Sequence, residues 1–309
     1  QRVSKFSGND FERIMIYFHK ALNYLAMDDA PAARIEISQA ETLMQELRIR
    51  TSTFPFLPLF LALIYEKIGD VENALVAYRR AIGAYKDGSE PSILKQGYLG
   101  LLSKYGRRSE LARATRTLKT KVAPLSKQDS QASLIVIVPR GIMTKMGSFT
   151  IYHIHPELKS NFLIALPVYS KYAGVKAAPL LNLQRQSADA APSLPILFAN
   201  IINVELEMRA ALKKEMPKIT SLALARAVVK NQIQQQANED ALAALFVFAV
   251  NTITEVADTR SWDLLPQAFY FSRLELQPGE YSLNYADRNP TNFSIKEGIN
   301  FLFVPNYRG

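Results

Sequence analysis

Apolar residues in the first 120 positions recur three or four residues apart instead of alternating. This spacing places them on one face of an amphipathic helix. Short acidic or glycine turns, at Asp28-Asp29 and Gly69-Asp70, separate the helices. The apolar positions that define the helix faces are Ile35, Ala40, Leu43, Leu75, Tyr78, Ala81 and Ile82. The pattern therefore predicts helix–turn–helix units in this part of the chain.

These units are related by an internal repeat with an offset of 41 residues. Ala21-Leu22-Asn23-Tyr24 aligns with Ala62-Leu63-Ile64-Tyr65, and Asp29 aligns with Asp70. A third, weaker copy spans Tyr98 to Leu118. Because one helical hairpin cannot bury its own apolar face, we expect the copies to stack.

The second copy resembles the tetratricopeptide repeat family. Its matching residues are Leu61, Ala62, Tyr65, Ala74, Tyr78 and Ala81, where small side chains let two helices approach and aromatic ones fill the remaining gap. The period exceeds the usual ~34 residues of that family, which an extended loop over Arg48–Pro58 would explain. The alternative is a coincidental match between two amphipathic hairpins.

The carboxy-terminal part has the patterns of β-strands around a helical region. Apolar runs or alternation predict strands at Ser133–Val138, Asn161–Tyr169, Ala268–Leu276, Tyr281–Tyr285 and Ile299–Val304. Residues 277–280, Gln-Pro-Gly-Glu, form a strand–turn–strand signal. Residues 197–256 have helical spacing, with a break expected at Pro217 and a turn at Asn238.

These patterns predict an α+β protein with two domains. Residues 1–125 would form tetratricopeptide-like helical repeats, and residues 131–309 a mainly antiparallel sheet with a helical insertion at 197–256. Pro124 and the polar run Ser126–Ser130 mark the expected boundary. We expect the sheet domain to dock away from the groove of the repeats.

The amino-acid composition excludes several kinds of catalytic and metal-binding site. The chain has 309 residues, no cysteine, three histidines and a net charge of +9, with 48% apolar residues. A chain this apolar is expected to fold, and the missing cysteines exclude disulfides, thiolate catalysis and Cys-ligated metals. The sequence has no glycine-rich phosphate motif, and no apolar run approaches the ~20 residues of a membrane-spanning helix. We therefore predict no catalytic residue, no cofactor and no metal site.

Most of the net charge lies between Lys104 and Lys127, where eight basic residues accompany one acid, Glu110. The predicted binding residues of this cationic strip are Arg107, Arg108, Arg113, Arg116 and Lys119. Three of them are spaced three residues apart, so a helix would align them toward phosphate, anionic lipid or an acidic partner. A plain solvated helix face is the alternative. Nucleic acid is a poor fit because no aromatic residues are interleaved with the charges.

The histidines are weak candidates for metal ligands. His153 and His155 would point to the same face of a strand, yet two ligands are too few. A third would have to come from His19 or from a carboxylate such as Glu157. We expect His153 and His155 to lie on a polar strand face, and His19 to be a half-buried neighbour of Tyr24.

Residues 257–266, with the sequence Ala-Asp-Thr-Arg-Ser-Trp-Asp-Leu-Leu-Pro, resemble the characteristic motif of an uncharacterised family of bacterial envelope lipoproteins. The order of segments is similar as well: helical repeats, an apolar strand, a stretch like 165–169, a helical middle and closing strands. The resemblance implies a periplasmic protein that is attached to the outer membrane through a lipidated cysteine upstream of Gln1.

Within this motif, Asp258 and Arg260 are close enough to form an ion pair, and Trp262 offers a large apolar surface. We expect a structural corner rather than an active site. Ser261 lacks the glycines of a nucleophile elbow.

These observations predict a non-enzymatic protein-binding scaffold or assembly subunit of the bacterial cell envelope, with a secretion, pilus or flagellar complex as one setting. Its partners would be other envelope proteins, bound in the groove of the repeats, or further copies in a homo- or hetero-oligomer. One alternative is an envelope hydrolase or glycan-acting enzyme with scattered carboxylates, Asp258 and Glu255 first among them. Another is an anion- or lipid-binding module that uses the cationic strip.

Overall fold

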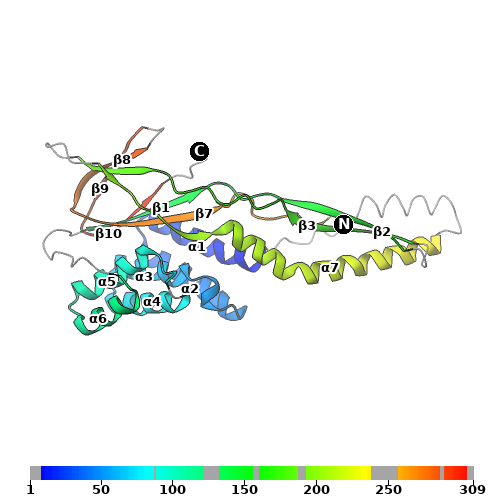
Figure 1. The fold of residues 1–309 in the computed structure, drawn as a ribbon, viewed down its shortest axis with the longest axis horizontal. Helices are drawn as coiled ribbons and strands as arrows, with labels where there is room; N and C mark the ends of the chain where they lie inside the picture. The colour runs from blue at the N-terminus through cyan, green and yellow to red at the C-terminus, as the bar shows by residue number, and fades with distance from the viewer. Residues whose placement is uncertain are drawn as a thin grey trace. The chain divides into compact units, whose positions relative to one another are not determined.

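The computed structural model describes residues 8–86, 88–120, 132–155, 160–186, 193–237, 257–285 and 289–304 (Figure 1). Its class is α+β, as predicted. Two compact units divide the chain. The main unit comprises Glu12–Gly141, Val175–Val204 and Pro266–Gly309, and the smaller unit Gln1–Phe11, Ile142–Gly174 and Glu205–Leu265.

The helices of the first 120 residues form three antiparallel pairs, in line with the predicted helix–turn–helix units. The pairs are α1 (Asp10–Ala26) with α2 (Ala30–Glu46), α3 (Phe56–Ile68) with α4 (Val71–Ala84), and α5 (Ser92–Lys104) with α6 (Arg108–Thr117). A short 3-10 helix, η1 (Thr51–Thr53), lies in the loop between α2 and α3, where the sequence predicted a long connection.

All three pairs are joined by the same turn. In each, a backbone N–H donates a 2.9 Å hydrogen bond to the carbonyl five residues earlier: Asp29 to Tyr24, Asp70 to Tyr65, and Arg107 to Leu102. The preceding residue has the left-handed conformation, with φ of 60° at Asp28, 87° at Gly69 and 70° at Gly106. This geometry satisfies the last carbonyls of a helix. The first two turns are related by the predicted 41-residue offset.

Two sheets complete the main unit. The first has the order β10 (Gly298–Phe303), β1 (Ala132–Arg140), β7 (Ala268–Leu276), β6 (Ala199–Asn203), and the second β5 (Leu194–Pro195), β4 (Leu181–Arg185), β8 (Gly279–Tyr285), β9 (Thr291–Ile295). The pairs are antiparallel except for β1 with β10, which is parallel. The expectation of a mainly antiparallel sheet therefore holds for these two sheets.

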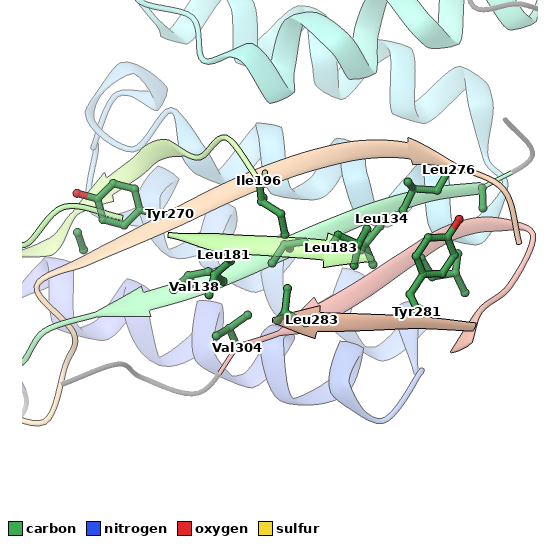
Figure 2. Close-up of a cluster of buried hydrophobic side chains, with 14 residues drawn as sticks. Leu134, Val138, Leu181, Leu183, Ile196, Tyr270, Leu276, Tyr281, Leu283 and Val304 are labelled. Atoms are coloured by element: carbon green, nitrogen blue, oxygen red, sulfur yellow. The ribbon is translucent and has the colours of Figure 1, made fainter. Parts of the chain in front are cut away.

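Alternate residues of β1 and β7 face two different layers. On one side, Leu134, Val138 and Tyr270 join a core with Leu181 and Leu283 of the second sheet (Figure 2). The residues between them face the helices. Because both faces are covered, β1 is buried without interruption from Ala132 to Val138, which explains its continuous apolar sequence.

The first helix of each pair packs against this central sheet. Phe18 of α1 meets Phe269 with ring centroids 5.3 Å apart, and Phe60 of α3 meets Phe271 at 6.0 Å. Helices α2, α4 and α6 lie on the side away from the sheet (Figure 1). The sheet was expected to dock away from the groove of the repeats; in the structure the aromatic face of β7 packs against α1 and α3.

The smaller unit contains an antiparallel hairpin, β2 (Met146–His155) with β3 (Ser160–Tyr169), and most of the long helix α7 (Val204–Ala237). The predicted break at Pro217 is wrong. Pro217 lies inside α7 at an exposed position, where a missing N–H costs one hydrogen bond without burying a polar group. The turn expected at Asn238 lies outside the described residues.

Two further features differ from the predictions. The helical region expected from residue 197 begins with β6, since Ile201 and Ile202 are buried where this strand pairs with β7. The strands on either side of residues 277–280 belong to different sheets and do not pair with each other. The expected domain boundary near residues 125–131 falls outside the described residues, and the compact units group the helix pairs with the two sheets.

Candidate functional site

The outer surface of the helix pairs carries a groove between α4, α5 and α6, which we call the α4–α6 groove. Its volume is about 450 Å³. It is lined by Arg79, Ile82, Tyr98, Glu110, Arg113, Ala114, Thr117 and Leu118. The floor is apolar and the rim is charged, which is the composition of a typical binding pocket.

Glu110 is the polar centre of the α4–α6 groove. Its Oε1 accepts a hydrogen bond from the Tyr98 hydroxyl at 2.7 Å and another from Arg79 Nη1 at 2.7 Å. These contacts, that of Tyr98 first, hold the pKa of Glu110 below its ordinary value. Burial and the bond to Glu110 raise the pKa of Tyr98 to about 12. The carboxylate is therefore ionised and already compensated within the chain.

The structure distributes the predicted cationic strip over α6 and its two ends. Arg107 precedes α6 and pairs with Glu72, and Arg108 is the first residue of the helix. Lys119 follows the end of α6 in a left-handed conformation, with φ of 48°, so it does not continue the helical row. All five residues of the strip are exposed. Of these five, Arg113 lines the groove.

Three of these cations keep their charge available. Arg108, Arg113 and Lys119 make no salt bridge with any residue that the structure describes. Arg116 donates from Nε to the Ala112 carbonyl at 3.2 Å, which leaves its charge uncompensated by an acid.

A second groove, between α1 and α2, has a volume of about 490 Å³. Its lining is mainly polar and consists of Arg13, Tyr17, Arg34, Ile35, Ser38, Gln39, Thr42, Leu43 and Glu46. Ile35, which the helical pattern placed on the apolar face, is 50% exposed here. Two arginines and one glutamate line this groove, as they do the α4–α6 groove, so the two grooves differ in the polarity of their lining and not in its formal charge.

A buried ionic cluster joins the helices to the central sheet, and the sequence analysis did not identify it. Arg273 of β7 donates from Nη1 and Nη2 to the two oxygens of Glu66 on α3, at 2.8 and 3.1 Å, and from Nε to Glu275 at 2.7 Å. Ser133 accepts from Arg273 and donates to Glu275, and the Tyr78 hydroxyl donates to Glu66.

The Arg273–Glu66 pair of this inner cluster is almost inaccessible to solvent. The side chains of Arg273 and Glu66 are 6% and 5% exposed. Burial raises the pKa of Tyr78 well above its ordinary value. The usable signal in the sequence was the placement of Arg273 two residues after Phe271, on the strand face that carries the inward aromatic side chains. The cluster is a structural link between α3, α4 and β7 rather than a site open to ligands.

The Asp-Thr-Arg-Ser-Trp motif forms a compact corner. Asp258 accepts from the Arg260 backbone N–H at 3.1 Å, from its Nε at 2.8 Å and from Nη2 at 2.7 Å. This pairing holds the pKa of Asp258 below its ordinary value. The Trp262 carbonyl accepts from the Leu265 N–H at 3.3 Å, which closes the next turn. The geometry agrees with the predicted ion pair, while Glu255, the other suspected carboxylate, lies outside the described residues.

A cation–aromatic cluster connects the hairpin of the smaller unit to α7. Arg209 pairs with Glu205 at 2.6 Å and donates to the Ser170 carbonyl at 2.7 Å. Its guanidinium lies over the rings of Tyr169 and Tyr172, 5.2 and 5.5 Å from their centroids. These contacts explain how a two-stranded hairpin, marginal by itself, is held on a helix.

Both elements of the smaller unit also expose large apolar side chains. They are Phe149, Ile151, Tyr152 and Val168 on the hairpin and Leu222, Leu224, Val228 and Val229 on α7. Exposed apolar side chains gathered in this way are typical of interaction surfaces.

Of the three histidines, only the side chain of His19 lies in the described part of the chain. The side chains of His153 and His155, and all of Glu157, lie outside the described part of the chain. His19 packs against Phe18 and Phe269, with ring centroids 6.1 and 5.6 Å away, and its burial lowers its pKa to about 4. Among the described residues, no three side chains of His, Asp or Glu come together as metal ligands.

None of the described helices combines the length and the apolarity that a membrane span requires. Comparisons of the chain with protein-family models, with curated proteins and with solved structures found no match.

Proposed function

We propose that the protein is a non-enzymatic, protein-binding assembly subunit that recognises its partner through the outer face of its helix pairs. In this proposal the pairs are tetratricopeptide-like repeats. The support is the 41-residue offset, which relates both the sequence and the turns of the first two pairs, and the same turn in the third.

One observation carries the proposal: the central sheet occupies the inner side of the repeats, while the α4–α6 groove stays open on the outer side. Helical repeats bind partners through extended surfaces. With Phe269 and Phe271 packed on α1 and α3, the inner side is already filled by the chain itself. The second helices of the pairs therefore provide the recognition surface.

The proposed setting is the periplasmic side of the bacterial outer membrane, in an assembly with other envelope proteins. It rests on the resemblance of residues 257–266 to envelope lipoproteins, which also implies a lipid anchor ahead of Gln1.

Site-specific photo-crosslinking in envelope fractions tests the proposal. A photoreactive residue replaces Ala112, which is exposed on α6, and a matched control replaces Lys213, which is exposed on α7. We expect a discrete crosslinked protein from position 112 that is absent from position 213. No crosslinked protein from α6, or the same set of products from both positions, would contradict recognition through the outer helices.

A further inference from the structure

We propose that the α4–α6 groove binds an acidic, amphipathic segment of a partner protein, with an apolar side chain on the groove floor and a carboxylate at Arg113. This inference rests on the proposed function and names the chemistry of the partner. Its basis is the combination of an apolar floor with cations that no described acid neutralises.

The floor of the groove favours an apolar anchor. Among its apolar lining residues the accessible surface comes mainly from the partly buried Ile82, because Ala114 and Leu118 are only 8% and 3% exposed. A small, fully hydrated anion would leave this surface without a partner. An inserted leucine or phenylalanine would bury it, which contributes roughly 25 cal/mol for each Å² removed from water.

The rim favours a carboxylate. Glu110 is engaged by Tyr98 and Arg79, so the positive charge of Arg113 is left for an incoming group. A carboxylate placed there would form a charge-assisted hydrogen bond, which is about twice as strong as a neutral one. Arg108, Arg116 and Lys119 add attraction at longer range and would speed the encounter at low salt.

The same geometry disfavours nucleic acid. Single-stranded nucleic acids need exposed aromatic rings on which bases stack. Tyr98, the aromatic residue that lines the groove, is 4% exposed, and its hydroxyl is bound to Glu110. A protein segment that uses both side-chain types fits the groove better.

Fluorescence anisotropy with the full chain tests this proposal. The probe is a labelled helical peptide of about 15 residues, a length at which isolated helices become stable, with leucine on one face and glutamate on the other. One control peptide replaces each glutamate by lysine, and a second replaces each leucine by serine. We expect the leucine–glutamate peptide to bind in a salt-dependent manner and both controls to bind at least about tenfold more weakly.

Two variants locate the binding. Arg113→Glu should weaken it by about tenfold or more, whereas Lys218→Glu makes the same charge change at an exposed position on α7 and should leave it unchanged. Thr117→Trp fills the groove without changing the charge and should also weaken binding. Both groove positions are exposed, so circular dichroism should show unchanged folding.

Several results would overturn the inference. Equal binding of the peptide without leucine, or full competition by inorganic phosphate or by phosphatidylglycerol vesicles, would indicate an anion or headgroup site instead. An equal loss in Lys218→Glu would indicate nonspecific attraction. If no peptide binds while the crosslink from position 112 persists, the proposed function survives and the acidic-segment inference fails.

Discussion

Two neighbouring clusters in the helix layer share a core of one tyrosine, one glutamate and one arginine, and the rings of Tyr78 and Tyr98 lie 6.0 Å apart. The inner cluster contains Tyr78, Glu66 and Arg273, and the outer cluster contains Tyr98, Glu110 and Arg79. In both, a tyrosine hydroxyl and an arginine donate to one carboxylate. The arginine and glutamate side chains are 6% and 5% exposed in the inner cluster but 47% and 24% exposed in the outer one.

The comparison shows that burial, and not the set of residues, decides what such a cluster does. Removing one partner of a buried ion pair leaves an uncompensated charge in a poorly solvated place. Water and salt compensate the same loss at the surface. The inner cluster therefore holds the sheet on the hairpins, while the outer one leaves a charged rim open to a ligand.

Arg273→Ala is expected to have the largest effect. It leaves the buried Glu66 without its cation, and such a loss costs about 3–5 kcal/mol in the free energy of unfolding. Urea denaturation followed by circular dichroism measures it. Arg79→Ala is the matched control and should cost less than about 1 kcal/mol. Similar values for the two variants would abolish the distinction between the clusters.

Acid should destabilise the inner side through His19. The folded state has the lower pKa, about 4 against 6.5, so the stabilising contribution is complete above pH 6.5 and is lost as the pH falls toward 4. The loss by pH 4 is about 3 kcal/mol, since the two pKa values differ by about 2.5 units and each unit corresponds to about 1.4 kcal/mol. The unfolding free energy of the wild type minus that of His19→Gln, measured from pH 7 to 4, should decrease. A flat difference would show that His19 is not held neutral against Phe269.

Two glycines allow the packing on the inner side to be compared with that at an open position. A Cβ at Gly97 on α5 would overlap the hydroxyl of Tyr78, a fully buried side chain, whereas a Cβ at Gly83 on α4 meets no atom within 4 Å. Gly97→Ala should therefore cost about 1–3 kcal/mol. Gly83→Ala should stabilise the protein by up to about 1 kcal/mol, because alanine favours the helix. Thermal unfolding measures both changes in stability. Equal shifts in Tm would mean that the side chains around Gly97 rearrange easily to accommodate the added methyl group.

The smallest expected effect belongs to the outer cluster. Glu110→Gln removes one partially exposed charge and should lower stability by less than about 1 kcal/mol in urea denaturation. It also frees Arg79 from its acid, so the leucine–glutamate peptide should bind more tightly. A large loss of stability together with unchanged binding would reverse the roles assigned to the two sides.

The helix pairs and the main strands were predictable because their patterns are local. The 41-residue offset placed the first two turns, and the apolar run Ala268–Leu276 matches β7 in both bounds. The short strand β6 was missed since Ile201 and Ile202 owe their conformation to pairing with β7. The continuity of α7 at Pro217 depends on solvent exposure, which periodicity does not report.

Neither the inner cluster nor the packing of the sheet on the helices could be predicted from the sequence, and the reason is different. Glu66 and Arg273 are 207 residues apart in the sequence, and no sequence pattern near either residue indicates that the two form an ion pair. The sequence predicted the charges of the candidate site but not its groove. The cations of α6 were found from their density, while the groove that gives Arg113 an apolar neighbourhood depends on how α4 and α5 pack.

The covering of the hairpins by β7 has a consequence for biosynthesis. Phe18 and Phe60 are made early, yet the strand that shields them begins at Ala268. At typical translation rates, ribosomes need roughly ten to fifty seconds to add the intervening residues. During that interval β7 does not yet cover the aromatic side of the nascent hairpins. We therefore expect a molecular chaperone that binds extended apolar chains to protect this side until β7 has been made.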